Sequence, residues 1–270
     1  MSFTARNSLA ELLFKAYFIS VRKRRFFLFF AILLAESESF SASLPFSAKA
    51  DDGLVLKGTL HLPDGVKEAR PVVILLPKMA SDRKSWGDFP KKLSAAGYAV
   101  LALDQRGHGE SVWQGKKKRS FLKFTNFDFA RMVTDLDAVL AALSKQKKVD
   151  ISRAAIYGAS IGANVALVYG AGHPEVRAVA LLSPGMDYKG ITPADAVVSW
   201  GHRPALIVAA EKDGYSALSS RKLASKIGEN AMLKMYEGKE HGTGLFAEQK
   251  DFGPFLFDWT LANFPMTSLK

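Results

Sequence analysis

Short apolar runs alternate with amphipathic segments from residue 51 almost to the end of the 270-residue chain. A continuous apolar run such as PVVILL at residues 71–76 is typical of a strand that is buried on both faces of a sheet. This pattern predicts strands at residues 54–62, 71–76, 98–103, 154–157, 176–182, 205–210 and 231–236. It predicts helices at residues 86–96, 129–143, 161–169, 195–200, 216–227 and 255–264.

This order of elements predicts an α/β fold in which a mostly parallel central sheet carries helices on both faces. Residues 51–270 are expected to form one domain. Residues 183–204 are too few to hold a large lid domain. The polar segment 104–127 is expected to be a long loop whose aromatic side chains pack down onto the sheet, and a partial roof over the site is the alternative. These side chains are Trp113, Phe121, Phe124 and Phe127.

Residues 1–50 are expected to be a leader. The basic block Arg22–Arg25 precedes ten apolar residues, Phe26–Ala35, which are too few to span a membrane but suit the core of a signal peptide. Ala48-Lys49-Ala50 matches an A-x-A cleavage pattern, so a mature periplasmic or secreted chain would begin at Asp51. An uncleaved leader that holds the protein on a membrane through residues 22–35 is the alternative.

The chain is basic and contains no cysteine. Its formal net charge is +11, and one run reads Lys116-Lys117-Lys118-Arg119. A basic chain can bind nucleic acid or an anionic membrane, but no nucleic-acid-binding motif accompanies the charge, so no nucleic-acid partner is expected. The lack of cysteine excludes disulfides, a cysteine nucleophile and cysteine-ligated zinc.

The pentapeptide Gly158–Gly162, a G-x-S-x-G, lies between an expected strand and an expected helix. A nucleophile elbow needs this context, because its serine stands on a turn so tight that the flanking residues must be small. The hydroxyl of Ser160 would then lie at a helix N-terminus, where backbone N–H groups can stabilise an oxyanion. A serine that merely caps an ordinary strand–helix turn is the alternative.

A nucleophilic serine needs a base and an orienting carboxylate at the same edge of the sheet. Among the five histidines, His241 alone both follows an expected strand at its carboxyl end and fits the chain order Ser, Asp or Glu, His that this architecture uses. His202 precedes a strand and would lie on the wrong side of the sheet. Asp213 follows an expected strand and lies between Ser160 and His241, so it is the preferred partner of the base. Glu211 and Asp187 are its rivals.

Five stretches together point to a known family: GYAVLALDQRGHGES (97–111), YGASIGANVAL (157–167), RAVALLSPGMDY (177–188), EKDGYS (211–216) and EHGTGLF (240–246). With them, residues 51–270 resemble the α/β-hydrolases, most of all the compact, dienelactone-hydrolase-like bacterial members. The resemblance implies that Ser160 is the nucleophile, His241 the general base and Asp213 its partner. It also implies no metal and no organic cofactor.

The chain departs from the resemblance after the strand expected at 71–76. The family usually places a His-Gly turn there, whereas this chain reads Pro77-Lys78-Met79. The backbone N–H of Ile161, directly after the nucleophile, is expected to be one oxyanion donor, and that of Met79 the other. Pro77 has no N–H to donate. A backbone donor survives a change of side chain, so the departure does not abolish the oxyanion hole.

These features predict a serine hydrolase that cleaves small carboxylic esters or thioesters through an acyl-enzyme. Peptidase-type cleavage of amides on the same triad is one alternative, although a peptidase of this fold usually carries an extra specificity domain. A hydrolase-like fold that binds without turnover is the other. No oligomeric state is predicted.

Overall fold

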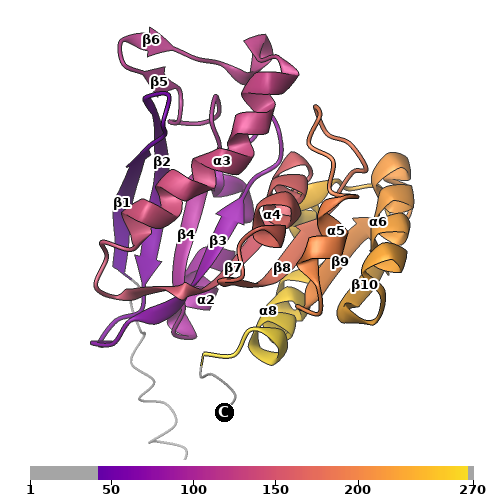
Figure 1. Cartoon of the computed structure of the whole chain (residues 1–270). Coiled ribbons are helices and arrows are strands. Elements are labelled where there is room, and N and C mark those ends of the chain that lie inside the picture. Colours follow the sequence, from indigo (N-terminus) through magenta and orange to yellow (C-terminus); the bar gives the residue numbers. More distant parts are fainter. Residues whose placement is uncertain (1–41, 267–270) are drawn as a thin grey trace, which may run out of the picture. The chain divides into compact units, whose positions relative to one another are not determined.

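The computed structural model describes residues 42–266, which form a single ten-stranded sheet covered by helices (Figure 1). The strand order is β10-β9-β8-β7-β3-β4-β2-β5-β6, and β1 also pairs with β2. The strands are β1 (Ala42–Lys49), β2 (Leu54–Leu62), β3 (Arg70–Leu76), β4 (Ala99–Asp104), β5 (Trp113–Gln114), β6 (Lys117–Lys118), β7 (Val149–Ala159), β8 (Val176–Leu182), β9 (Ala205–Ala210) and β10 (Ala231–Tyr236).

Helices α2 to α6 lie in the connections between parallel strands, as parallel pairing requires, and α7 and α8 follow the last strand. They are α2 (Phe89–Ala95), α3 (Asn126–Leu143), α4 (Ile161–Ala171), α5 (Ala196–Trp200), α6 (Gly214–Ile227), α7 (Leu245–Glu248) and α8 (Phe252–Asn263). Strands β3, β4, β7, β8, β9 and β10 are parallel, whereas β1, β2, β5 and β6 pair in antiparallel fashion at one side of the sheet. The predicted α/β fold with a mostly parallel sheet is therefore confirmed.

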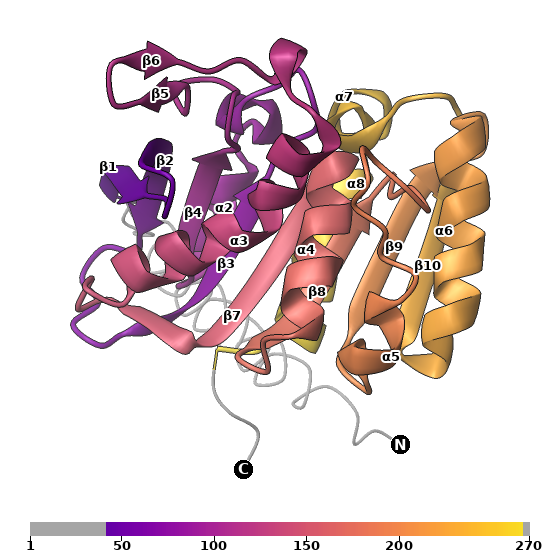
Figure 2. The ribbon, with the colours of Figure 1, turned by 45° about the horizontal axis from the view of Figure 1, so that its top comes forward.

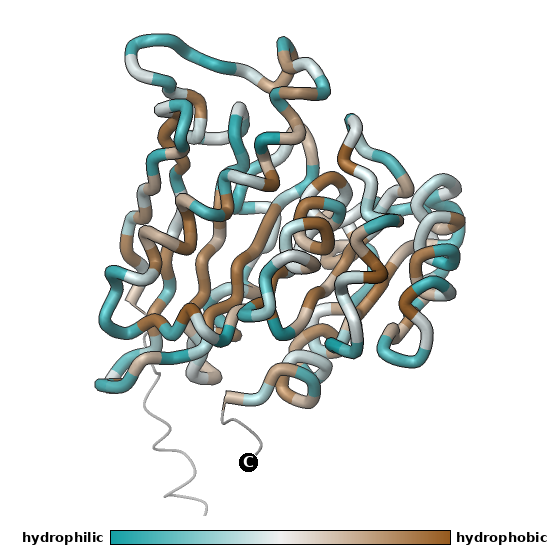
Figure 3. The backbone as a smooth tube through the Cα atoms, viewed as in Figure 1, coloured by the Kyte–Doolittle hydropathy of each residue, from teal (hydrophilic) through white to brown (hydrophobic). Residues whose placement is uncertain are grey.

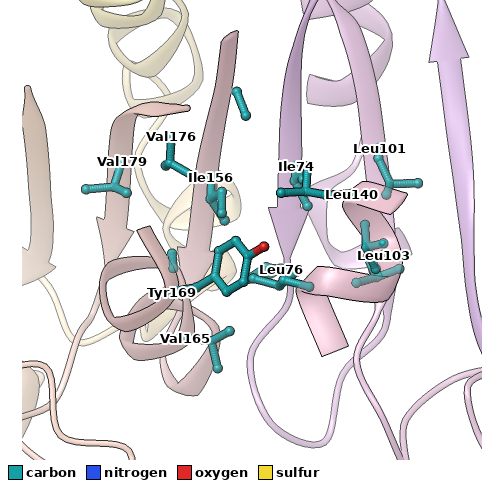
Figure 4. Close-up of a cluster of buried hydrophobic side chains, with 14 of the residues drawn as sticks. Ile74, Leu76, Leu101, Leu103, Leu140, Ile156, Val165, Tyr169, Val176 and Val179 are labelled. Carbon is teal, nitrogen blue, oxygen red and sulfur yellow. The ribbon is translucent and has the colours of Figure 1, made fainter. Parts of the chain in front are cut away.

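The parallel strands are buried on both faces because successive side chains of each strand point into two different cores. In β3, Ile74 and Leu76 pack under α3 and α4, while Val73 and Leu75 pack against α2 and α8. Figure 4 shows side chains of the first core, and Figure 3 shows the apolar strands between more polar helices. Between β8 and β9 the structure places only α5 and its flanking loops, so no large lid is present within residues 183–204.

Strand β1 corrects the expected domain boundary. The sequence analysis assigns residues 42–50 to the leader, whereas Ala42–Lys49 pairs along its whole length with β2 and buries Phe46 and Ala48. The folded domain therefore includes residues before Asp51, and cleavage after Ala50 would remove one strand. The basic and apolar stretch at residues 22–35 lies outside the described residues.

The segment 104–127 is also more ordered than the expected loop. It contains the β5–β6 hairpin and a 3₁₀ turn at Phe121–Lys123. Its aromatic residues divide into two groups: Phe121 and Phe124 pack against the first core, whereas Trp113 and Phe127 are exposed. Within residues 42–266, no helix has the length and apolar character needed to cross a membrane.

The pairing of β1 leads to a stability prediction. Phe46→Ala is expected to lower the free energy of unfolding by about 3 kcal/mol, because it empties a buried aromatic site. Leu44→Ala, at an exposed position of the same strand, should change it by less than about 1 kcal/mol. Urea denaturation of both variants measures the difference. Equal effects would contradict a structural role for β1.

Candidate active site

Ser160 stands on a strained turn between β7 and α4. Its backbone has φ 55° and ψ −121°, a left-handed conformation that residues other than glycine rarely adopt. The turn is held by a hydrogen bond from the Ser160 N–H to the carbonyl of Leu182, at 2.8 Å. The side chain is 6% exposed and lies beside the first N–H groups of α4. This is the geometry expected of a nucleophile elbow.

The two glycines of the pentapeptide make this turn sterically possible. A Cβ atom at Gly158 would collide with the backbone carbonyl of Gly162. A Cβ atom at Gly162 would lie 2.7 Å from the carbonyl oxygen of Leu76 and 2.8 Å from that of Pro77. The strand, the helix and the loop after β3 therefore approach one another more closely than any side chain at these two positions permits.

The structure brings Asp213 and His241 together. Asp213 lies after β9 at the start of α6, and His241 lies in the loop after β10. The His241 Nδ1 atom is 2.7 Å from Asp213 Oδ2. Because the carboxylate can only accept, Nδ1 carries the proton and Nε2 of a neutral imidazole is left as a proton acceptor. The pair thus has the tautomer that a general base requires.

The turn after His241 packs against the residue before Ser160. Gly242 has φ 61°, and a Cβ atom there would lie 3.1 Å from the Cβ of Ala159. Its N–H donates to the Ser183 hydroxyl at 2.9 Å, and Ser183 follows β8. The ends of β7 and β8 and the His241 loop are therefore linked directly. The catalytic roles of Ser160, Asp213 and His241 stay a prediction.

The rival carboxylates have other partners. Glu211 accepts hydrogen bonds from Arg221 at 2.7 and 2.6 Å on the surface. Asp187 accepts from the N–H of Gly190 at 2.7 Å within its own exposed turn.

The remaining histidines are occupied elsewhere: His61 contacts Ser43, His108 stacks on Phe121, His173 stacks on Tyr169, and His202 lies near Asn230. Among residues 42–266, no group of three or more His, Asp or Glu side chains is arranged to hold a metal ion.

The two residues expected to form the oxyanion hole lie at adjoining elements. Ile161 is the first residue of α4, and Met79 lies in the turn after β3. The loop that leads into that turn is held by Gln105, whose buried side-chain amide donates to the Pro77 carbonyl at 2.7 Å. From the other side, Lys78 Nζ lies 3.4 Å from the carbonyl oxygen of His241. The role of both backbone N–H groups as oxyanion donors also stays a prediction.

Tyr188 joins the site although the sequence analysis assigns it no role. Its hydroxyl lies 2.8 Å from the hydroxyl of Ser216, and the nearby side chain of Ser160 also influences its pKa. Its ring meets that of His241 edge to face at 6.3 Å. Burial raises the pKa of the Tyr188 phenol, so it is protonated at neutral pH. Tyr188 therefore presents a neutral hydroxyl to the candidate nucleophile.

The loop that carries Tyr188 is positioned by side chains from two helices. Asn164 of α4 donates to the Ile191 carbonyl at 2.7 Å and accepts from the N–H of Gly185 at 3.0 Å. The Tyr215 hydroxyl of α6 contacts the backbone of Asp187. Only the stretch GMDYKG marks this loop in the sequence, and these long-range contacts are not visible there.

Comparison with known proteins agrees with this architecture. Residues 67–203, half of the chain, match the family model described as serine aminopeptidase, S33. The chain belongs to this family of α/β-hydrolases. The matched region contains Met79, Ser160 and Ile161 but ends before Asp213 and His241. No curated protein sequence matches the chain.

Several solved structures share the fold. An esterase from Pyrococcus furiosus has a TM-score of 0.65 at 17% identity, over 83% of this chain and 92% of that one. A dienelactone hydrolase from Anabaena variabilis has a TM-score of 0.65 at 20% identity, over 83% and 99%. An acylaminoacyl peptidase from Pyrococcus horikoshii has a TM-score of 0.68 at 12% identity, over 89% of this chain but 44% of that one. These identities establish the fold alone.

The strained turn can be tested independently of activity. Ser160→Gly and Ser160→Ala both remove the hydroxyl, but only glycine relieves the left-handed backbone. Relief of about 1–3 kcal/mol of strain exceeds the ~0.4–1 kcal/mol that glycine costs through the unfolded chain. Ser160→Gly is therefore expected to have the higher free energy of unfolding, by about 1 kcal/mol, in urea denaturation. A less stable glycine variant would contradict the strained turn.

Proposed function

We propose that this α/β-hydrolase is a serine hydrolase that cleaves carboxylic esters or thioesters through an acyl-enzyme. The observation that carries the proposal is the 2.7 Å contact between Asp213 and His241 Nδ1, at the edge of the sheet where Ser160 stands on its strained turn. Folding of the sheet does not require the Asp213–His241 contact and the strained turn at Ser160 to occur together. Together they support a triad of Ser160, His241 and Asp213.

In this proposal His241 Nε2 takes the Ser160 proton as the hydroxyl oxygen attacks the acyl carbonyl. Asp213 holds the imidazole in the required tautomer and stabilises the imidazolium that forms. His241 then gives the proton to the leaving alcohol or thiol as the tetrahedral intermediate collapses. A water molecule, deprotonated by His241, attacks the acyl-enzyme, and the acid is released from Ser160.

The negative charge of the tetrahedral intermediate needs two donors. The Ile161 N–H is available at the start of α4, and that of Met79 lies in the turn that Gln105 fixes through Pro77. Preorganised donors of this kind typically contribute a factor of about 10²–10³ in kcat each. Replacement of the family's His-Gly turn by Pro77-Lys78-Met79 leaves this backbone donor in place.

An ester or thioester is favoured over an amide by the alignment with the solved structures. The esterase and the dienelactone hydrolase that it resembles are covered almost entirely, at 92% and 99% of their lengths. The acylaminoacyl peptidase is covered only to 44%, so more than half of that protein has no counterpart here. Peptidase-type amide cleavage, which the family description suggests, is the second candidate. A binding protein without turnover is the third.

Export to the periplasm or beyond remains part of the proposal, because of the basic and apolar stretch at residues 22–35. The alternative is a chain held on the membrane by that stretch. Since β1 belongs to the sheet, a cleavage site compatible with the fold would lie before Ala42 rather than after Ala50.

The proposal is tested by treating the protein with a fluorophosphonate and measuring its intact mass. One adduct is expected on the wild type and none on Ser160→Ala. Asp213→Asn should lower kcat on a p-nitrophenyl ester by about 10⁴-fold, since the imidazole then loses its orienting carboxylate. Glu211→Gln is the matched control, because Glu211 bonds Arg221 instead, and it should stay within a few-fold of wild type.

Substrate class is separated by comparing p-nitrophenyl esters with amino-acid p-nitroanilides. Faster turnover of the anilides would replace the ester proposal by the peptidase one. No adduct on folded wild type would contradict the triad and favour the binding protein.

A further inference from the structure

The segment Trp113–Phe127 concentrates positive charge on the surface. It contains five basic residues and no acidic one: Lys116, Lys117, Lys118, Arg119 and Lys123. The four lysines are exposed. The next acidic residue along the chain, Asp128, already pairs with Arg119 at 2.7 Å. We name this segment the basic flap.

Large apolar side chains are exposed among these charges. Trp113 is 49% exposed, Leu122 80% and Phe127 71%. They differ from Phe121 and Phe124, which pack inward, on His108 and Phe129 respectively. The flap therefore holds its inner aromatic residues in the fold and presents a second set to solvent.

The flap is fixed to the sheet rather than free. Strand β5 pairs with β2 through Val55 and Trp113, and β6 pairs back on β5 through Trp113 and Lys118. The Gln114 side-chain amide donates to the Asp52 carbonyl at 2.8 Å. Figures 1 and 2 show this hairpin projecting beyond the ends of the neighbouring strands. A surface presented in this way loses little conformational freedom on binding.

We propose that the basic flap docks this protein on an anionic lipid surface. Lysines near an anionic leaflet are attracted to it, and adjacent tryptophan, leucine and phenylalanine side chains enter the headgroup region. Charge complementarity alone would also suit a nucleic acid. However, exposed Leu122 and Phe127 side chains gain nothing from phosphate contacts, whereas burial in a lipid interface removes their apolar area from water.

The flap borders a cleft that reaches the turn after β3, next to an expected residue of the candidate site. A cleft of about 660 Å³ is lined by flap residues, among them Lys118 and Phe121, and by Ala80 and Ser81 of the turn after β3. Ala80 directly follows Met79, the expected oxyanion donor. If the proposed function holds, the flap would bring the enzyme to esters that are presented in a membrane. The docking itself does not depend on that function.

Tryptophan fluorescence reports on the flap specifically. Of the four tryptophans, Trp86, Trp200 and Trp259 are buried and only Trp113 is exposed. The full chain is mixed with phosphatidylglycerol vesicles that contain a doxyl-labelled lipid as quencher. We expect quenching that is absent with phosphatidylcholine vesicles, absent in Trp113→Phe and weakened by high salt. This readout distinguishes the flap from residues 22–35, which can hold the chain to a membrane without bringing Trp113 to the lipid.

Matched variants test both parts of the surface. Replacing Lys116, Lys117 and Lys118 by Gln should raise the lipid concentration for half-maximal quenching by about 100-fold. The same change at the exposed Lys145, Lys147 and Lys148, beyond the other end of α3, should leave it within about threefold, because those lysines lie far from the flap. The double variant Leu122→Ser, Phe127→Ser should also need more lipid for half-maximal quenching. Val198→Ser, at an exposed apolar residue on α5, should not.

Three results would overturn the proposal: no quenching in anionic vesicles, equal loss in the control lysine variant, or protection of Trp113 by single-stranded DNA but not by vesicles. Hydrolysis of a soluble ester is recorded in parallel. Its absence with intact quenching would contradict the proposed function and leave the docking supported.

Discussion

The candidate site depends on one strained backbone position that cannot relax. Ser160 is held at φ 55° because the strand before it and the helix after it approach too closely for any side chain at Gly158 or Gly162. Strain of this kind costs about 1–3 kcal/mol and persists only where the surrounding structure enforces it. Here the two buried cores enforce it, since they fix β7 and α4. Ser160 therefore lies just beyond the end of β7, beside the first N–H groups of α4.

The parallel sheet then assembles the other groups around this turn. Because β7, β8, β9 and β10 run in the same direction, the residues that follow them meet at one edge. Asp213 after β9 reaches His241 after β10, and the turn after His241 is tied to Ser183 after β8. Apolar burial in the strands thus fixes polar geometry at their ends.

The parallel strands and the residues at their ends could be predicted from the sequence, whereas strand β1 and the position of Tyr188 could not. Continuous apolar runs mark strands that are buried on both faces. Chain order leaves Asp187, Glu211 and Asp213 as candidate partners of His241, and the structure shows that the contact is with Asp213. Strand β1 escapes detection because only Phe46 and Ala48 of its residues are buried, so it resembles the Ser-rich end of a leader. Tyr188 reaches Ser160 only through a turn with left-handed Lys189 and through contacts from distant helices, which no local pattern reveals.

The central claim is that the strained turn and the loop after β3 together form a working site for an acyl oxyanion. A crystal structure of the protein after reaction with a fluorophosphonate tests it most directly. The account predicts phosphorus bonded to Ser160 Oγ, with the phosphonyl oxygen about 2.7–3.1 Å from the backbone nitrogens of both Ile161 and Met79. Phosphorus on another residue, or a phosphonyl oxygen turned away from both nitrogens, would contradict it.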